Sequence, residues 1–364
     1  MDPSGAAKVV PDWAVAGWHP EGMSCRDRVI ATALALLALA LGAAALLSEM
    51  AAAAWPGRSG PVVYLGVRPV TSNTACCSPY ETIGLRIFEP GDPRSVRVLT
   101  VGRSDADPQV SPNGRTIVFT REIPSELPFP HPEKVNVLFA IGVDGEGLRQ
   151  LTGVSPDGGS DFKPSFYPSG EAIVFARGGG ATGENDLYSI RLDGTGLRQL
   201  TEGPALEEAP TVSPKGRQIA FACGPAGGNE RIEDVCSIRP DGSHRRVLSR
   251  GLKQGAEPFD PDFSPSGRTI AFTLGPGTAS DVFTMRADGS RLGALTNRGP
   301  NGRRRFPRQV GYASPAFAPG GGSIVAVARP GAGPRLVRIR LRDPQHPQTL
   351  IQGSLGSAPI WVPG

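Results

Sequence analysis

The stretch Pro261-Asp-Phe-Ser-Pro265-Ser-Gly267-Arg-Thr-Ile270-Ala-Phe272 decides the fold, because close copies of it return along the chain. In every copy a second proline follows four residues later, then a glycine two residues on and an isoleucine three beyond that. Phenylalanine ends every copy except the last, which has Ala326 instead. A Pro-x-Gly turn between two alternating apolar runs predicts a β-hairpin. The other copies begin at Pro108, Pro164, Pro210 and Pro315.

Each copy continues with a second alternating run, a tight turn and a short closing run. In the fourth copy these parts are Asp281-Val-Phe-Thr-Met-Arg286, Asp288-Gly289 and Leu295-Thr296. Glycine accepts the positive φ that a short hairpin turn demands. One unit of roughly 45 to 55 residues is therefore expected to form a propeller blade of four antiparallel strands, with the Pro-x-Phe strand innermost. The last copy has Asp343-Pro344 in place of Asp-Gly, so its turn should differ.

The two chain ends predict the number of blades. The segment Ser357-Ala-Pro359-Ile-Trp361-Val-Pro363-Gly364 repeats the opening of the motif and then stops. Near the other end, Val62-Val-Tyr64 reads like the Ile-x-Phe strand with nothing before it, and residues 86–88 and 99–100 supply the rest of a blade. Sharing this blade between the ends leaves no open strand edge. We predict an all-β, six-bladed β-propeller over residues 60–364, closed by the strand at 357–364.

The first 59 residues are a different kind of sequence. Residues 29–47 form an uncharged apolar run. At about 1.5 Å per residue in a helix, its length approaches the roughly 30 Å of a bilayer core. Arg26 and Arg28 precede it, which predicts that residues 1–28 stay in the cytoplasm as a short segment. The propeller is then expected outside the cytoplasm, joined to the apolar run by a linker at 48–59.

Two fates of the apolar run stay open. It is either a retained transmembrane anchor or the core of a signal peptide that is cut near Ala53 or Ala54. Met23 offers an alternative start to Met1. The propeller is thus expected to be tethered to the cell membrane or secreted.

The repeat resembles that of TolB-like propellers of the WD-like superfamily, whose consensus is close to Pro-x-Trp/Phe-Ser-Pro-Asp-Gly, Ile-x-Phe, Asp-Gly and Leu-Thr. The match covers about residues 60–364. The resemblance implies that the Phe, Ile and Leu positions pack between blades and that the glycines mark turns. TolB carries an α/β domain ahead of its propeller, which is missing between residues 48 and 59 here, so a role in the Tol–Pal system is not implied. Similar propellers also precede peptidase domains or form polysaccharide lyases.

Composition and motifs argue against catalysis and against nucleic acid as a partner. The formal net charge is only +4, which is too small and too evenly spread for nucleic-acid binding. The chain has no Gly-x-Ser-x-Gly motif, and the histidines lack the spacing of metal ligands. We therefore predict a monomeric, non-enzymatic propeller without a cofactor or metal.

Variable loops are the expected place for binding, because the hairpin turns are short and uniform whereas the other loops differ widely. Asp105, Asp161 and Glu207 each lie three residues before a repeat proline. They are interpreted either as solvated turn residues or as an incomplete acidic ring that binds a cation or a basic peptide group. A second candidate is a basic loop suited to carboxylate or phosphate groups or left solvated, with Arg298, Arg303, Arg304, Arg305 and Arg308.

The cysteines of the exported part offer candidate disulfides. Cys223 and Cys236 fall on the second and third strands of one blade, so a cross-strand disulfide is expected. Cys76 and Cys77 are adjacent in a loop and could pair only as a strained vicinal disulfide. Metal binding by these two lacks further ligands nearby.

The favoured function is an envelope or exported binding module that engages a protein or polymer through the variable loops. A carbohydrate-binding or polysaccharide-degrading propeller is the first alternative; it would need paired carboxylates or an aromatic shelf in a groove. An extracytoplasmic sensor domain is the second, and it requires the apolar run at 29–47 to be retained.

Overall fold

The computed structural model places the chain in two units, residues 1–46 and 47–364, and all described residues belong to the second. The segments predicted at 1–28 and 29–47, and all but the last residue of the linker 48–59, lie outside the described residues. In the described part of the chain, no helix is long and apolar enough to cross a membrane. The described residues are 59–69, 80–88, 95–101, 104–128, 132–179, 184–224, 232–250, 252, 256–275, 280–296, 310–318, 320–330, 335–352 and 360–363.

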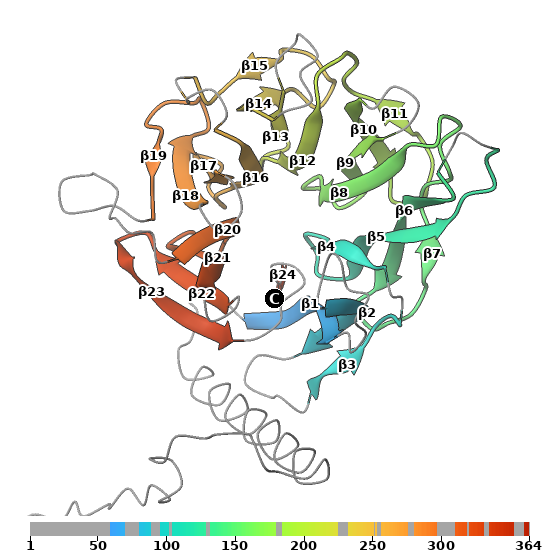
Figure 1. The fold of residues 1–364 in the computed structure, drawn as a ribbon, viewed down its shortest axis with the longest axis horizontal. Helices are drawn as coiled ribbons and strands as arrows, with labels where there is room; N and C mark the ends of the chain where they lie inside the picture. The colour runs from blue at the N-terminus through green and yellow to red at the C-terminus, as the bar shows by residue number, and fades with distance from the viewer. Residues whose placement is uncertain are drawn as a thin grey trace, which may run out of the picture. The chain divides into compact units, whose positions relative to one another are not determined.

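These residues form six four-stranded antiparallel sheets arranged as blades around a central channel (Figure 1). The all-β, six-bladed propeller predicted from the repeat is confirmed. Within each blade the first strand lies innermost, next to the channel (Figure 1).

The strands of blades 1 to 3 are, from the channel outward, β24 (Ile360–Pro363), β1 (Ser59–Pro69), β2 (Tyr80–Phe88) and β3 (Arg97–Val98); β4 (Ala106–Val110), β5 (Thr116–Pro124), β6 (Lys134–Gly142) and β7 (Arg149–Gln150); β8 (Ser160–Phe166), β9 (Ala172–Gly178), β10 (Asn185–Arg191) and β11 (Arg198–Gln199).

Those of blades 4 to 6 are β12 (Glu207–Val212), β13 (Ile219–Cys223), β14 (Asp234–Ile238) and β15 (Arg246–Val247); β16 (Pro258–Phe263), β17 (Thr269–Leu274), β18 (Asp281–Arg286) and β19 (Gly293–Ala294); β20 (Val310–Phe317), β21 (Ser323–Pro330), β22 (Arg335–Arg340) and β23 (Asp343–Gln352).

Blade 1 closes the ring by combining strands from the start of the propeller sequence with β24 near residue 360. β24 pairs antiparallel with β1, so that Val62 lies opposite Trp361 and Val63 lies opposite Ile360. The prediction of a shared blade is therefore correct. Backbone hydrogen bonds between β24 and β1 thus close the ring within blade 1.

The short hairpin turns gather on one face of the ring, which we call the turn face. In blade 3 the turn after β8 and the turn after β10 touch, because Leu192 N donates a hydrogen bond to Glu171 O at 2.8 Å. Equivalent bonds join the two turns in blades 2, 5 and 6. Strands two and three are joined on the opposite face, the loop face, as are consecutive blades, because antiparallel strands reverse direction at each turn. The predicted separation of uniform turns from variable loops follows this division.

Apolar packing between neighbouring blades forms the core. One cluster joins Val235 and Leu248 of blade 4 to Ile270 and Phe272 of blade 5. A phenylalanine at such a position removes its whole ring from water, and its truncation to alanine typically costs about 3–5 kcal/mol. The interpretation of the Ile-x-Phe strands as packing elements is correct, since their phenylalanines are fully buried at Phe119, Phe175, Phe221 and Phe272.

The last blade departs from the others at its outer edge, as its sequence predicts. Arg340 pairs directly with Asp343, so a two-residue turn leads into β23, which has 10 residues. The outer strands of blades 1 to 5 have two residues each, for example β19. Proline at position 344 thus lies in the outermost strand of the blade, where proline is tolerated.

Candidate functional site in the central channel

A β-bulge interrupts the innermost strand of each of blades 2 to 6, at the residue before the repeat proline. The pairing with the second strand shifts register there in all five blades. Positive φ is uncommon outside glycine, and a bulge re-aims the side chain that it carries. The five residues have φ between 45° and 53°; they are Asp107, Lys163, Ala209, Asp260 and Ser314.

Charged side chains at these bulges meet in the channel. Lys163 Nζ lies 3.3 Å from Asp107 Oδ1 and 3.4 Å from Asp260 Oδ1. Blade 2 and blade 5 face each other across the ring (Figure 1), so these ion pairs span the channel. The Ser314 hydroxyl donates to Asp260 Oδ2 at 2.8 Å. The Lys163 side chain keeps 43% of its surface exposed, which leaves it accessible from the channel.

Glu208 adds a further carboxylate beside the bulge of blade 4, and it accepts a hydrogen bond from Asn185 Nδ2 at 2.9 Å. Burial raises the pKa of Glu208, which Lys163 partly offsets and Asp260 reinforces. For Lys163 burial acts to lower the pKa, but Asp260 and Asp107 outweigh it and hold the pKa above its ordinary value. We call Asp107, Lys163, Glu208, Asp260 and Ser314 the channel belt. With one cation and three carboxylates, the belt favours a cationic group of a partner.

The sequence did not single out the channel belt. Its signal is the residue before each repeat proline, where a charged side chain occurs in blades 2, 3 and 5. That position looks like an ordinary turn in the sequence, because the bulge that re-aims it is visible only in the strand pairing.

The three acids that the sequence did single out lie elsewhere, between the blades. Asp105, Asp161 and Glu207 expose 2% of their surface or less, so the interpretation as solvated turn residues is wrong. Arginines cover their carboxylates: Arg121 Nε is 2.6 Å from Asp105 Oδ1, and Arg177 Nε is 2.5 Å from Asp161 Oδ1. Removing either partner of such a buried pair is strongly destabilising, because the other charge is left buried without a counterion. These side chains are thus enclosed within the fold rather than presented to a ligand.

In blade 3 the arginine of this pair also lies over two neighbouring aromatic rings, Phe175 and Tyr188, whose centroids are 6.0 Å apart. The Arg177 guanidinium carbon lies 5.6 Å from the ring centroid of Phe175 and 5.1 Å from that of Tyr188. Blade 2 repeats the arrangement, with Arg121 over the rings of Phe119 and Phe139. Cation–π contacts of this kind add to the ion pair where water is excluded.

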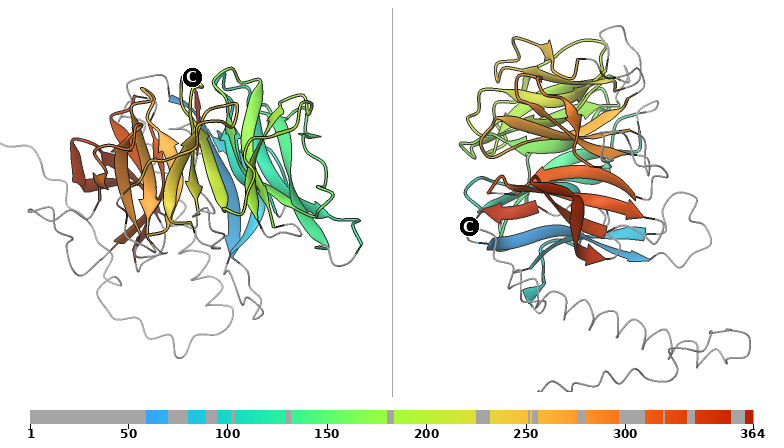
Figure 2. Two further views of the ribbon diagram at one scale, coloured as in Figure 1. Left: turned by 90° about the horizontal axis from the view of Figure 1, so that it is seen from above. Right: turned by 90° about the vertical axis from the view of Figure 1, so that its left-hand side faces the viewer.

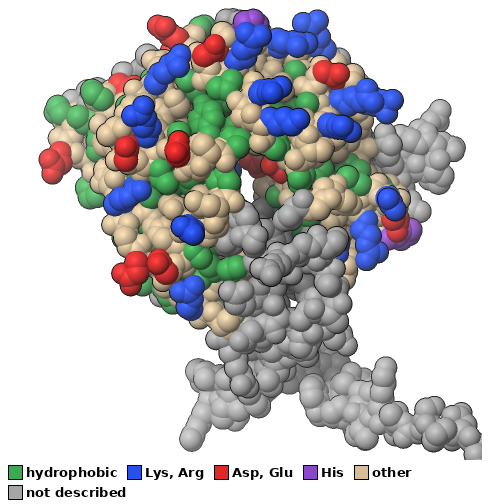
Figure 3. Space-filling model, turned by 180° about the vertical axis from the view of Figure 1, so that it is seen from behind, with side chains coloured by type: hydrophobic (Ala, Val, Ile, Leu, Met, Phe, Trp, Pro, Cys, Tyr) green, Lys and Arg blue, Asp and Glu red, His purple; other side chains and the backbone are tan. Residues whose placement is uncertain are grey.

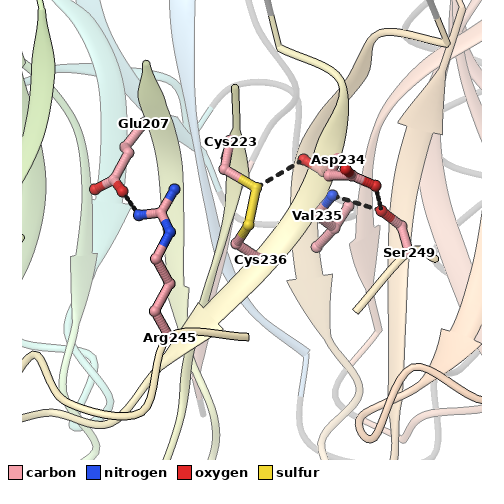
Figure 4. The surroundings of a disulfide bond; sticks show 7 residues. All are labelled: Glu207, Cys223, Asp234, Val235, Cys236, Arg245 and Ser249. Atoms are coloured by element: carbon pink, nitrogen blue, oxygen red, sulfur yellow. Dashed lines mark hydrogen bonds and ion pairs between the residues drawn. A yellow bond between two sulfur atoms is a disulfide. The ribbon is translucent and has the colours of Figure 1, made fainter. Parts of the chain in front are cut away.

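Blade 4 replaces that stack with a disulfide (Figure 4). Cys223 stands where blade 3 has Arg177, sixteen residues after the acid, and a disulfide joins it to Cys236 of the neighbouring strand. Glu207 is instead paired with Arg245, which reaches in from the turn before β15 and lies 5.4 Å from the Phe221 ring. The same buried carboxylate is therefore neutralised by an arginine from a different element.

The Leu-Thr motif has a role that the sequence did not reveal. The threonine hydroxyl accepts the N–H of a third-strand residue, for example Leu138 N to Thr152 Oγ1 at 2.9 Å. In blade 4 the Ser249 hydroxyl also donates to Asp234 Oδ1 at 2.6 Å. The outer strand is too short to hold itself by ladder bonds alone, so this hydroxyl fixes its end. Equivalent bonds come from Thr100, Thr201, Ser249 and Thr296.

The remaining candidates fall outside the described residues. These are Cys76 and Cys77 and the arginines at 298, 303, 304, 305 and 308. Within the described part of the chain, no cluster of three or more His, Cys, Asp or Glu side chains is arranged to hold a metal ion.

Comparison with known proteins identifies the fold. No protein-family model and no curated protein sequence matches the chain. Among solved structures, TolB from Acinetobacter baumannii superposes with a TM-score of 0.58 at 18% identity, covering 84% of this chain and 67% of that one. A nidogen/laminin complex gives 0.54 at 10% identity, covering 79% and 93%. An oligogalacturonate lyase in complex with manganese gives 0.50 at 11% identity, covering 79% and 85%. The chain thus has the fold of a TolB-like six-bladed β-propeller.

Proposed function

We propose that the chain is a non-catalytic binding module of the cell envelope, tethered or secreted, that holds a partner protein at the loop-face mouth of its channel. The observation that carries the proposal is the channel belt. Its bulges fix two aspartates and one lysine on a closed scaffold, and Glu208 lies beside them. Preorganised polar groups in a channel select a partner without having to be ordered on binding.

The chemistry of the belt suggests the part of the partner that enters the channel. Three carboxylates facing one lysine leave room for a second cation. A lysine, arginine or amino-terminal group of a peptide segment fits this charge pattern. A chain of a nidogen/laminin complex has a similar fold at 10% identity, which is consistent with a binding role.

Site-specific photo-crosslinking in cells tests the proposal. A photoreactive amino acid at Glu126, which is exposed on the loop face, should capture a discrete partner. The same amino acid at Ser266, exposed on the turn face, is the matched control. Replacing Asp107 and Asp260 by asparagine should reduce capture from Glu126 at least about fivefold, because the belt loses its excess of negative charge. Equal capture with and without these substitutions would exclude the belt as the binding site.

A carbohydrate-degrading function is the competing hypothesis, motivated by the shared fold of the oligogalacturonate lyase. It predicts that the purified protein cleaves polyuronides to unsaturated products, which absorb in the ultraviolet. Turnover that disappears when belt carboxylates are replaced would overturn the binding proposal and establish the alternative.

A further inference from the structure

The turn face is strongly basic. Arginine follows the turn glycine in blades 2, 4 and 5, and arginine ends or directly follows the third strand in blades 3 to 6. Among the described residues of this face, exposed basic side chains outnumber acidic ones by about two to one. Figure 3 shows Lys and Arg side chains spread over the described part of this face, with Asp and Glu among them. The third-strand members are Arg191, Arg239, Arg286 and Arg340.

Three aspartates among them are hydrogen-bonded within their own turns. Asp193, Asp241 and Asp288 each accept the N–H of the residue two positions on, at 2.9 Å. Side-chain and backbone hydrogen bonds in these turns lower the pKa of all three carboxyls. The oxygens of these three aspartates thus have local hydrogen-bond partners. The arginines therefore supply most of the charge that this face presents to another surface.

Exposed apolar residues accompany the arginines at the rim of the same face. Val96, Leu148 and Leu197 expose 44%, 48% and 49% of their surface. Each directly precedes an arginine at the start of an outer strand, so an apolar and a basic side chain recur together in blades 1 to 3. Apolar side chains interleaved with arginine are typical of surfaces that lie on lipid headgroups and dip into the acyl boundary. A hydrated polysaccharide would leave these apolar side chains in contact with water, so it would gain little from them.

The chain also enters the propeller at the turn face. Ser59 begins β1 opposite Pro363, the end of β24. The innermost strand of a blade ends at the turn face, so this end of the β24–β1 pair lies there; β1, blue in Figure 2 (left), runs from one face of the ring to the other. The apolar run at 29–47 is separated from Ser59 by residues 48–58 alone. Eleven residues reach at most about 40 Å when fully extended. A bilayer spanned by residues 29–47 would therefore lie within reach of the turn face.

From these observations we propose that residues 29–47 are retained as a membrane anchor and that the turn face docks on the anionic headgroups of that membrane. Arginines supply the attraction to the headgroups, and the rim residues Val96, Leu148 and Leu197 insert beside them. The loop face then points away from the bilayer, which leaves the channel mouth open to a partner. The proposal does not depend on what the channel binds.

Arginine modification on the full chain in lipid nanodiscs tests the docking. One set of discs is phosphatidylcholine, and a second contains about one third phosphatidylglycerol. Phenylglyoxal modification is mapped by mass spectrometry at low salt and at about 0.5 M salt. We expect Arg191, Arg239 and Arg286 to react at least about threefold more slowly in the anionic discs at low salt, and equally fast in both discs at high salt. Arg250, exposed on the loop face, is the internal reference and should not change.

Two variants separate the apolar contribution to docking from the basic one. L148S/L197S should lose most of the protection while keeping every charge, and R191Q/R239Q/R286Q should expose Arg268 of the same face. Equal modification of the wild type in both discs, or equal protection of Arg250, would overturn the proposal without any variant. If heparin protects the same arginines as strongly in phosphatidylcholine discs, the partner is a soluble polyanion and the lipid assignment is wrong. Unchanged photo-crosslinking from Glu126 in the same variants would show that partner binding at the channel does not depend on membrane docking.

Discussion

Blades 3 and 4 neutralise a buried carboxylate in two different ways. Both bury a carboxylate between neighbouring blades, Asp161 in one and Glu207 in the other. Blade 3 neutralises it with Arg177 from the adjacent strand, which lies over the rings of Phe175 and Tyr188. Blade 4 has a disulfide in that space and recruits Arg245 from a turn.

The difference shows which part of the repeat is under physical constraint. A carboxylate at this depth requires a cation, because an unpaired buried charge costs several kcal/mol. The element that supplies the cation is free to change. Blade 5 confirms the point, since Pro258 replaces the acid and Leu274 replaces the arginine together. Charge and countercharge are thus kept or lost as a pair.

Breaking the pair in blade 3 should have the largest effect. We expect R177M to lower the free energy of unfolding by about 3–5 kcal/mol at pH 7.5, since Asp161 stays buried without its cation. Burial already raises the pKa of Asp161, and losing Arg177 removes the main opposing influence. The folded variant therefore takes up a proton as the pH falls, and its deficit should shrink at pH 5. Urea unfolding at both pH values measures this.

The control for that experiment is R191Q, an exposed arginine on the same β10 strand. It should change the free energy of unfolding by less than about 0.5 kcal/mol. A loss from R177M of the same small size would mean that Asp161 is not dependent on its arginine.

Removing the disulfide of blade 4 should have a smaller effect. C223S/C236S opens a cross-link between residues 13 positions apart, which stabilises by about 2–3 kcal/mol through the unfolded chain. Urea unfolding of the double variant should match that of the reduced wild type. A much larger loss would mean that the disulfide also positions the ion pair between Arg245 and Glu207.

The smallest effect concerns a carboxylate that occurs in both blades at the start of the third strand. Asp234 accepts the Ser249 hydroxyl, whereas Asp186 accepts Gln199 Nε2 at 3.0 Å. Burial raises the pKa of Asp186 to about 6. The folded protein therefore binds this proton more tightly than the unfolded chain, and stability falls as the pH rises from about 4 to 6. D186N should be more stable than the wild type at pH 7.5, by up to about 1 kcal/mol, and indistinguishable from it at pH 4.

D234N is the matched control, and its effect should have the opposite sign. The Ser249 hydroxyl loses a charged acceptor, so the free energy of unfolding at pH 7.5 should fall by about 0.5–1 kcal/mol. Thermal unfolding followed by circular dichroism at the two pH values separates the pair. Destabilisation of both variants at pH 7.5 would contradict the raised pKa of Asp186.

Much of the fold followed from the sequence. The repeat predicted the blades, the Ile-x-Phe strands predicted the core, and the split motif at residues 62–64 and 359–363 predicted the closure. These signals are local, because strand alternation and turn glycines act over a few residues. The environments of the charged residues were harder to predict from the sequence. Asp161 was expected at an exposed turn or in an open ring but lies between two blades, where its environment depends on residues sixteen positions away.

The sequence alone determined that this protein is a closed ring of six similar units, because a period-two pattern with fixed turns admits few other arrangements. The tertiary structure decided which side chains meet. Lys163 lies between aspartates of two other blades, 56 residues before it and 97 after it, through bulges that the motif does not reveal. It also decided that the chain enters the ring at its arginine-rich face, since strand direction in the shared blade is settled by pairing at a distance. Contacts across a ring depend on how the units are placed around an axis, and no local pattern carries that information.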